Sequence, residues 1–205
     1  MTLFPSLGAA PAGLRRERIL SSPRYRNGRF ENTDPVATNV DPHKMWGTTV
    51  EYFAGGRGVE RRPTHVLPVE NPLEAWTRPA SSGLRATWLG HSTTLLEIDG
   101  LRVLTDPVWG ERASPVTFAG PRRFHPSPVA IGELPRLDAI LISHDHFDHL
   151  DYPTIRALAA SGVPFVTSLG VGAHLEAWGV PANTITELDW WQTATLGPLA
   201  FHATP

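Results

Sequence analysis

The sequence of 205 residues contains no cysteine, which excludes disulfide bonds, thiolate nucleophiles and metal sites built on sulfur ligands. A metal ion would therefore have to be held by His, Asp or Glu side chains. Long apolar runs are also missing, and none approaches the roughly 18–20 residues that a membrane-spanning helix needs. The positive charges near the N-terminus follow the apolar stretch instead of preceding it, the reverse of a secretory signal. We therefore expect a cytoplasmic protein.

An excess of positive charge is absent as well, because 18 Lys and Arg residues stand against 20 Asp and Glu, for a formal net charge of −2. No overall positive field exists to attract nucleic acid, so we do not expect a nucleic-acid partner. Of the basic residues only Lys44 is a lysine. Arginine can make bidentate contacts to phosphate or carboxylate where it clusters, although codon usage explains the bias more simply.

The composition changes at about residue 80. Residues 1–80 are rich in Pro, Gly and Arg with few periodic apolar stretches, which is typical of an irregular extension wrapped on a domain. Residues 81–205 carry strand-like runs and helix signals, and Asp99-Gly100 is a strong hairpin turn between two of the runs. Hairpins come first and β-α-β units later, which predicts an α/β fold with a mixed sheet and helices on one face. The expected strands are 85–89, 93–98, 101–105, 137–143, 163–168, 184–188 and 199–203. The expected helices are one from Asp41 to about Phe53, one capped by Asp151 and ended near Gly162, and one over 171–178.

Metal-binding side chains are concentrated directly after the 137–143 run, in the pattern His-x-His-x-Asp-His. Such a pattern should arise by chance on the order of once in a thousand chains of this composition. His144 and His146 are two residues apart on an extended segment, so their rings project to one side and can bind one cation. A following turn would let Asp148 and His149 reach a second cation nearby, as in two-metal hydrolytic sites. We expect Asp145 to be exposed or to support the ligands from outside.

Zinc suits this donor set best, with manganese or iron as alternatives because carboxylate ligands accept them too. A solvated polar turn or an adventitious metal site are the other interpretations of the cluster. Elsewhere, Arg122 and Arg123 form the only paired arginines within the motif-bearing region. They are candidates to grip a substrate phosphate, and a plain surface pair is the alternative.

Several segments resemble the metallo-β-lactamase superfamily, and within it the branch of N-acylphosphatidylethanolamine-hydrolysing phospholipase D, with the L-ascorbate-6-phosphate lactonases as more distant relatives. The matching segments are TWLGHSTTLLEIDG (Thr87 to Gly100), LTDPVWGERASP (Leu104 to Pro115), GPRRFHPSP (Gly120 to Pro128), LDAILISHDHFDHLDYPTI (Leu137 to Ile155) and ELDWW (Glu187 to Trp191). The resemblance implies an αββα sandwich, of which this chain holds the N-terminal half.

By this resemblance, His144 and His146 would bind the first of two metal ions, and Asp148 and His149 would bind the second and set the catalytic geometry. Asp106 would orient ligands without touching metal, or it caps a turn before Pro107. His91 lies in a segment shared with the branch, where it would be a pocket residue or make a structural hydrogen bond. The implied activity is phosphodiester hydrolysis of N-acylphosphatidylethanolamine-like glycerophospholipids by a hydroxide that bridges the two metal ions.

The family's second half supplies a third histidine, a bridging aspartate and a last histidine, which have no match in this sequence. His202 precedes a Thr-Pro step instead of following it, which makes it a poor substitute for the third histidine. Half a sandwich would also leave an apolar sheet face uncovered. We therefore expect the remaining C-terminal half to complete the site, with a second copy of the chain as a further partner and at most peripheral contact with a membrane. Lactone or ester hydrolysis by the same site and a non-catalytic metal-binding fragment are the alternative functions.

Overall fold

The computed structural model describes residues 5–33, 46–47, 65 and 68–205. It divides into two compact units, Met1–Pro23 with Val69–Pro205, and Arg24–Pro68. In the smaller unit, β1 (Tyr25–Arg26) and β2 (Arg29–Phe30) form a short antiparallel pair. Residues 34–45, 48–64 and 66–67 of the expected extension, which include most of the helix expected from Asp41, lie outside the described residues, and the boundary at residue 80 stays a prediction.

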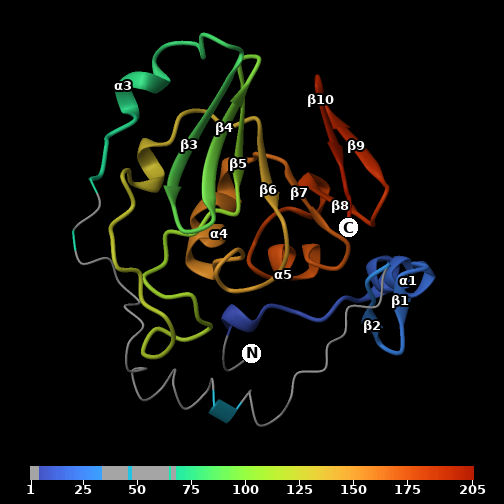
Figure 1. The fold of residues 1–205 in the computed structure, drawn as a ribbon. Coiled ribbons are helices and arrows are strands. Elements are labelled where there is room, and N and C mark those ends of the chain that lie inside the picture. Colours follow the sequence, from blue (N-terminus) through green and yellow to red (C-terminus); the bar gives the residue numbers. More distant parts are fainter. Residues whose placement is uncertain (1–4, 34–45, 48–64, 66–67) are drawn as a thin grey trace. The chain divides into compact units, whose positions relative to one another are not determined.

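A six-stranded mixed sheet dominates the larger unit, with the strand order β3-β4-β5-β6-β7-β8 (Figure 1). The first three strands are antiparallel to one another, and β5 to β8 run parallel. Asp99 and Gly100 both have positive φ, 48° and 85°, so the Asp-Gly turn forms between β4 and β5 as predicted. The strands are β3 (Leu84–Gly90), β4 (Thr93–Ile98), β5 (Leu101–Thr105), β6 (Ala139–Ile142), β7 (Phe165–Ser168) and β8 (Ile185–Leu188).

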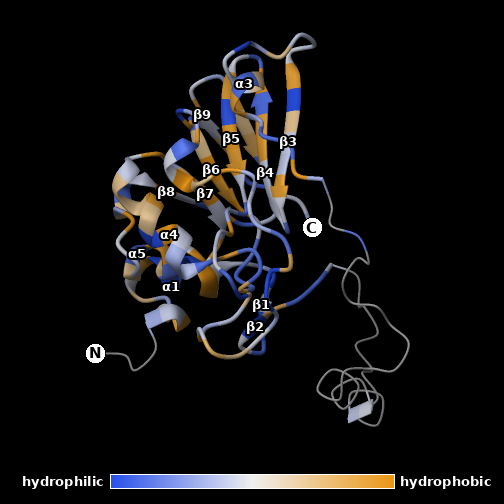
Figure 2. Ribbon diagram, turned by 90° about the vertical axis from the view of Figure 1, so that its left-hand side faces the viewer, coloured by the Kyte–Doolittle hydropathy of each residue, from blue (hydrophilic) through white to orange (hydrophobic). Residues whose placement is uncertain are grey.

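Two helices, α4 (Tyr152–Leu158) and α5 (Gly172–Ala177), pack on one face of this sheet. The shared core is apolar, and Figure 2 shows the hydrophobic colouring of the central strands. The predicted α/β class, a mixed sheet with helices on one face, is confirmed. Buried core residues from the strands include Leu95, Leu104, Ile140 and Phe165, and those from the helices and their ends include Ile155, Leu158, Leu175 and Trp178.

The other face of the sheet is apolar but less covered. Leu84 and Trp88 alternate with residues of the core face along β3, and their side chains are 58% and 57% exposed. Leu96 on β4 and Leu141 on β6 lie on the same face and are partly buried, whereas Val103 and Val166 there are buried. Neighbouring apolar side chains exposed in this way are typical of a surface on which other polypeptide packs.

The N-terminal segment forms η1 (Pro5–Leu7) and α1 (Gly13–Ser21), a helix that the sequence pattern did not predict. Arg15 Nε donates to Glu187 Oε2 at 2.7 Å, and Trp178 Nε1 donates to the carbonyl of Pro5 at 2.8 Å. These partners lie more than 170 residues apart in sequence, so the contacts attach the start of the chain to β8 and the end of α5.

The remaining elements are short. None of the helices in the described ranges is long and apolar enough to cross a membrane. The antiparallel strands β9 (Thr193–Leu196) and β10 (Leu199–His202) form a hairpin of their own. One further α-helical turn is α3 (Leu73–Trp76), and the remaining 3-10 turns are η2 (Ile131–Glu133), η3 (Ala159–Ser161) and η4 (Ala182–Thr184).

Candidate metal centre

The candidate site is built at the carboxyl ends of β5 and β6, which lie together because these strands are parallel. Asp106 follows β5, and its backbone N–H donates to the carbonyl of Leu141 on β6 at 2.8 Å. The φ angle of Asp106 is 42°, a left-handed conformation that Asp tolerates better than most residues. The backbone is further held by the Thr93 hydroxyl, which donates to the Asp106 carbonyl at 2.9 Å.

The Asp106 carboxylate links the strand ends to the His-rich segment. Its Oδ1 accepts from the backbone N–H of Ser143 at 2.7 Å, and its Oδ2 accepts from the Ser143 hydroxyl at 2.8 Å. His149 Nδ1 lies 2.9 Å from the same Oδ2. Asp106 is 9% exposed, so these bonds are shielded from water. A supporting role for Asp106 requires such contacts, because a carboxylate on Nδ1 orients an imidazole whose Nε2 can bind metal.

The three histidines of the motif stand close together. The ring of His144 is 4.1 Å from the ring of His149 and 4.7 Å from that of His146, measured between centroids. His149 Nε2 lies 3.9 Å from Asp148 Oδ2, against about 3.4 Å for two ligands of one tetrahedral zinc ion. The donor types and this spacing fit a cation. Within the described ranges, however, no group of three or more His, Asp or Glu side chains could hold a metal ion.

His91 joins the site from the turn between β3 and β4. Its φ angle is 51°, and its Nε2 lies 3.2 Å from Asp148 Oδ2. The neighbouring Ser92 hydroxyl donates to the Asp148 carbonyl at 2.6 Å. Of the two roles considered for His91, the structure shows a hydrogen bond, and the bond is made to a candidate metal ligand.

Electrostatics differ between the two kinds of candidate ligand. Burial lowers the pKa of His144, and the neighbouring rings of His149 and His146 lower it further. Burial of the Asp148 carboxyl acts to raise its pKa, but the hydrogen bond from His91 and the nearby His149 outweigh burial and lower the pKa. Both shifts favour the forms that bind metal, the neutral imidazole and the carboxylate.

Two other candidates lie apart from the cluster. Asp145 is exposed, and its support of the metal ligands stays a prediction. His202 lies in β10, and its Nδ1 is 2.9 Å from the Thr193 hydroxyl across the hairpin.

Arg122 and Arg123 have different surroundings. The Arg122 guanidinium forms an ion pair with Glu111, and both side chains are more than half exposed. Arg123 Nη2 donates to the carbonyl of Val108, while its Nε and Nη1 are buried without a partner among the described residues. Burial lowers the pKa of Arg123, and attraction to Asp151 offsets this only in part. The two guanidinium groups therefore make separate contacts, and their binding of substrate stays a prediction.

Hydroxyl side chains around the site were not singled out from the sequence. Ser143 contacts Asp106 and His144, Ser92 contacts Asp148, and Thr93 contacts the backbone of Asp106. Their only signal was position, since Ser143 directly precedes the motif and the other two follow His91.

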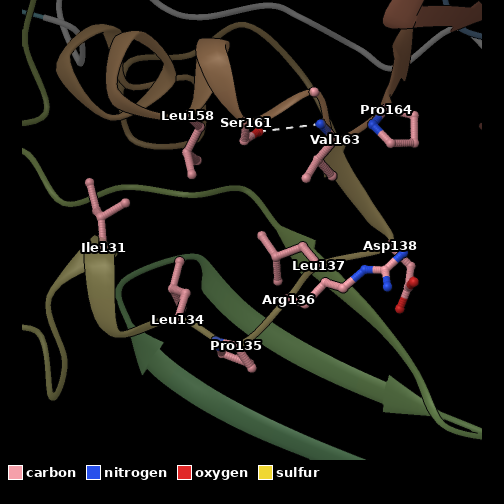
Figure 3. Close-up of a pocket in the computed structure, with 11 residues that line it drawn as sticks. Ile131, Leu134, Pro135, Arg136, Leu137, Asp138, Leu158, Ser161, Val163 and Pro164 are labelled. Carbon is pink, nitrogen blue, oxygen red and sulfur yellow. Dashed lines mark hydrogen bonds between the residues drawn. The ribbon is translucent and has the colours of Figure 1, made fainter.

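A cavity of about 480 Å³ lies away from this cluster, at the amino ends of β6 and β7 (Figure 3). Leu137 and Asp138 precede β6 there, and Val163 and Pro164 precede β7. Ligands of parallel sheets bind beyond the carboxyl ends of the strands. The cavity is therefore separate from the candidate metal centre.

Comparison with known proteins places residues 101–205 in a match to the β-lactamase superfamily domain. An uncharacterized protein of Mycobacterium tuberculosis is 46% identical over 202 residues, covering 98% of this chain and 53% of the relative. N-acyl-phosphatidylethanolamine-hydrolyzing phospholipase D 1 of Caenorhabditis elegans is 41% identical over 203 residues, covering 92% of this chain and 56% of the relative. The chain thus spans about half the length of these curated relatives.

More distant similarities include a UPF0173 metal-dependent hydrolase of Anaeromyxobacter dehalogenans, 32% identical over 109 residues, with 53% of this chain and 36% of the relative covered. Among solved structures, Igni18, a metallo hydrolase from Ignicoccus hospitalis, gives a TM-score of 0.40 at 20% identity, covering 55% of this chain and 42% of that chain.

Proposed function

The chain belongs to the metallo-β-lactamase superfamily, and we propose that it forms part of a metal-dependent hydrolase that cleaves phosphodiesters. The observation that carries the proposal is the arrangement of His144 and His149. Each ring has its Nδ1 within hydrogen-bond distance of the Asp106–Ser143 pair, which leaves each Nε2 for a metal ion. The similarity to the Caenorhabditis elegans phospholipase supports an N-acylphosphatidylethanolamine-like substrate.

We propose that His144 and His146 hold one metal ion and that Asp148 and His149 hold a second. Zinc fits imidazole and carboxylate donors, with manganese and iron as alternatives. A divalent cation bound here would polarise a phosphoryl oxygen and lower the pKa of water to near neutrality. The chain's own groups prepare this chemistry, because Asp106 orients His149 and His91 holds the Asp148 carboxylate in place.

Two ligands for each cation are too few for a stable site, so we propose that further polypeptide supplies the rest. Two observations support this proposal. The curated relatives are about twice as long as the matched segment, and one face of the sheet leaves Leu84 and Trp88 exposed. The same face is suited to packing against a second sheet. A homodimer, peripheral membrane contact, a cytoplasmic location and the absence of a nucleic-acid partner remain predictions.

The test begins with metal content. The purified 22.4 kDa chain is stripped with chelator, reloaded with zinc and measured by mass spectrometry of the metal. We expect fewer than two tightly bound equivalents. Two tight equivalents in this chain would contradict the proposal that further polypeptide completes the site.

Activity is then measured on a longer form of the protein, in which the further polypeptide completes the site, with bis-p-nitrophenyl phosphate, N-acylphosphatidylethanolamine in detergent micelles and simple lactones as substrates. We expect metal-dependent hydrolysis of the phosphodiesters, lost in His149→Ala and retained in His65→Ala, which changes an exposed histidine outside the site. Turnover of lactones alone would refute the phosphodiesterase proposal and favour the ester-hydrolase alternative. Metal binding without any turnover would support the non-catalytic alternative.

A further inference from the structure

The Ser143 hydroxyl occupies a branch point inside the candidate metal centre. Its Oγ lies 2.8 Å from Asp106 Oδ2, 2.9 Å from His144 Nδ1 and 3.4 Å from His149 Nδ1. The Ser143 backbone is held on both sides, because its N–H donates to Asp106 Oδ1 at 2.7 Å and its carbonyl accepts from the Ser168 hydroxyl at 2.7 Å. These backbone hydrogen bonds fix the position from which the Ser143 side chain extends.

Counting protons decides the direction of these bonds. A hydroxyl has one proton to donate, and a carboxylate has none. The short contact between Ser143 Oγ and Asp106 Oδ2 therefore uses the Ser143 proton. His144 Nδ1, at 2.9 Å from the same oxygen, must then donate its own proton to the remaining lone pairs. His149 Nδ1 must likewise donate to Asp106 Oδ2.

We propose that Ser143 is a positioning residue that fixes the neutral His144 ring in the tautomer protonated on Nδ1. In this tautomer Nε2 carries a free lone pair, the state that a metal ligand needs. Asp106 fixes His149 in the same way, directly, and it fixes His144 through Ser143. The Asp106 carboxylate thereby determines the tautomer of both rings. The inference deepens the proposed function, since it assigns the free Nε2 atoms to metal, but the tautomer belongs to the metal-free protein.

The alternative is that the Ser143 hydroxyl donates its proton to His144, and it predicts the other tautomer of that ring. If Ser143 donated to His144 Nδ1, that ring would carry its proton on Nε2 and would have to lose or move it before binding metal. Asp106 Oδ2 would then lack the serine proton at 2.8 Å, and two acceptors would face each other at hydrogen-bond distance. The first arrangement is favoured because it avoids this contact between two acceptors.

The test records long-range ¹H–¹⁵N correlations of the imidazole rings in the metal-free protein at a pH of about 8, where an ordinary histidine is neutral. His144→Gln and His149→Gln spectra assign the two rings. In the wild type we expect both rings to be protonated on Nδ1. A wild-type His144 protonated on Nε2 would overturn the proposal without any variant being needed.

Variants then separate positioning from a general structural role. Ser143→Ala should shift His144 towards a mixture of tautomers and leave His149 on Nδ1, while Ser143→Thr, which retains the hydroxyl, should restore the wild-type spectrum. Ser168→Ala is the matched control, because the hydroxyl that it removes donates to the Ser143 carbonyl and, among the described residues, contacts neither imidazole ring, so it should leave both tautomers unchanged. An unchanged His144 in Ser143→Ala would contradict the proposal.

Zinc titration distinguishes this inference from the proposed function. Zinc affinity should fall by about 10–100-fold in Ser143→Ala, as it does when partners of metal ligands are removed. The expected tautomers together with no zinc binding in the wild type would refute the metal site and leave the role of Ser143 in place. Zinc binding with equal affinity in the wild type and Ser143→Ala would overturn that role.

Discussion

Replacement of Asp151 by alanine should destabilise the segment that carries the candidate metal ligands. Asp151 is the N-cap of α4 and is 4% exposed. Its Oδ2 accepts from the backbone N–H of Thr154 at 3.3 Å, from the Thr154 hydroxyl, and from the backbone N–H of Gly110 at 2.9 Å. The Asp151 carboxyl, two residues after His149 in the sequence, thus joins the start of α4 to the loop that follows β5.

The size of the loss follows from these contacts. A lost N-cap costs about 1 kcal/mol, and a buried donor without a partner, here the Thr154 hydroxyl, costs about 1–3 kcal/mol. Asp151→Ala should therefore lower the free energy of unfolding by about 3 kcal/mol, a factor of about a hundred in the folding equilibrium. Burial raises the pKa of Asp151, so the uncharged Asp151→Asn, which retains one acceptor oxygen, should lose only about half as much.

Urea unfolding followed by tryptophan fluorescence measures these losses. Asn71→Ala is the control, because Asn71 Oδ1 accepts from the Leu73 N–H at the start of α3 in an exposed position, and its loss should stay below about 1 kcal/mol. If Asp151→Ala were no less stable than Asn71→Ala, the interpretation of Asp151 as a buried link between the two segments would be wrong.

Three further predictions concern packing, charge and pH. Gly90 has a φ of 103°, and a Cβ added there would lie 2.7 Å from the His125 ring, so Gly90→Ala should lower the free energy of unfolding by about 2–4 kcal/mol. Gly132→Ala, whose Cβ would lie in open space, should lower it by less than about 0.5 kcal/mol. Equal losses for the two variants in a urea titration would contradict this prediction. Arg15→Ala removes the cation that pairs with Glu187, whose side chain is 5% exposed. It should lower the free energy of unfolding by about 1–2 kcal/mol in the same measurement, a limited loss because Arg15 itself is partly solvated. An unchanged free energy of unfolding would argue against docking of α1. Burial lowers the pKa of His174 below its ordinary 6.5, and attraction to Asp145 opposes this only in part. As the pH falls, the unfolded chain therefore takes up the proton first, so the stability that this group contributes is complete above about pH 6.5 and declines below it. The free energy of unfolding of His174→Gln should decline less than that of the wild type between about pH 7 and pH 5.

Local signals in the sequence predicted much of this structure. The Asp-Gly turn at 99–100 and the Asp151 cap formed as expected, because both depend on residues that act within a few positions of themselves. The alternation of hairpins and β-α-β units predicted the mixed sheet for the same reason. The cluster at 144–149 was found because its spacing alone is rare.

Other features depend on contacts between distant residues and could not be derived from local patterns. His91 meets Asp148 across 57 positions, and Arg15 meets Glu187 across 172. α1 has weak periodicity and forms where Arg15 meets Glu187 and Glu176. The role inferred for Ser143 needed distances to three neighbours, since a serine before a His-rich motif has many uses.

The Nε2 atoms of His144 and His149 are each expected to face a divalent cation. Crystals of the protein soaked with zinc and measured at the zinc absorption edge test this claim most directly. The predicted result is anomalous peaks bonded to these Nε2 atoms at about 2.0–2.1 Å, one at His144 shared with His146 and the other at His149 shared with Asp148. Zinc bound through Nδ1 of either ring, or bound only elsewhere, for example at His202, would contradict the account.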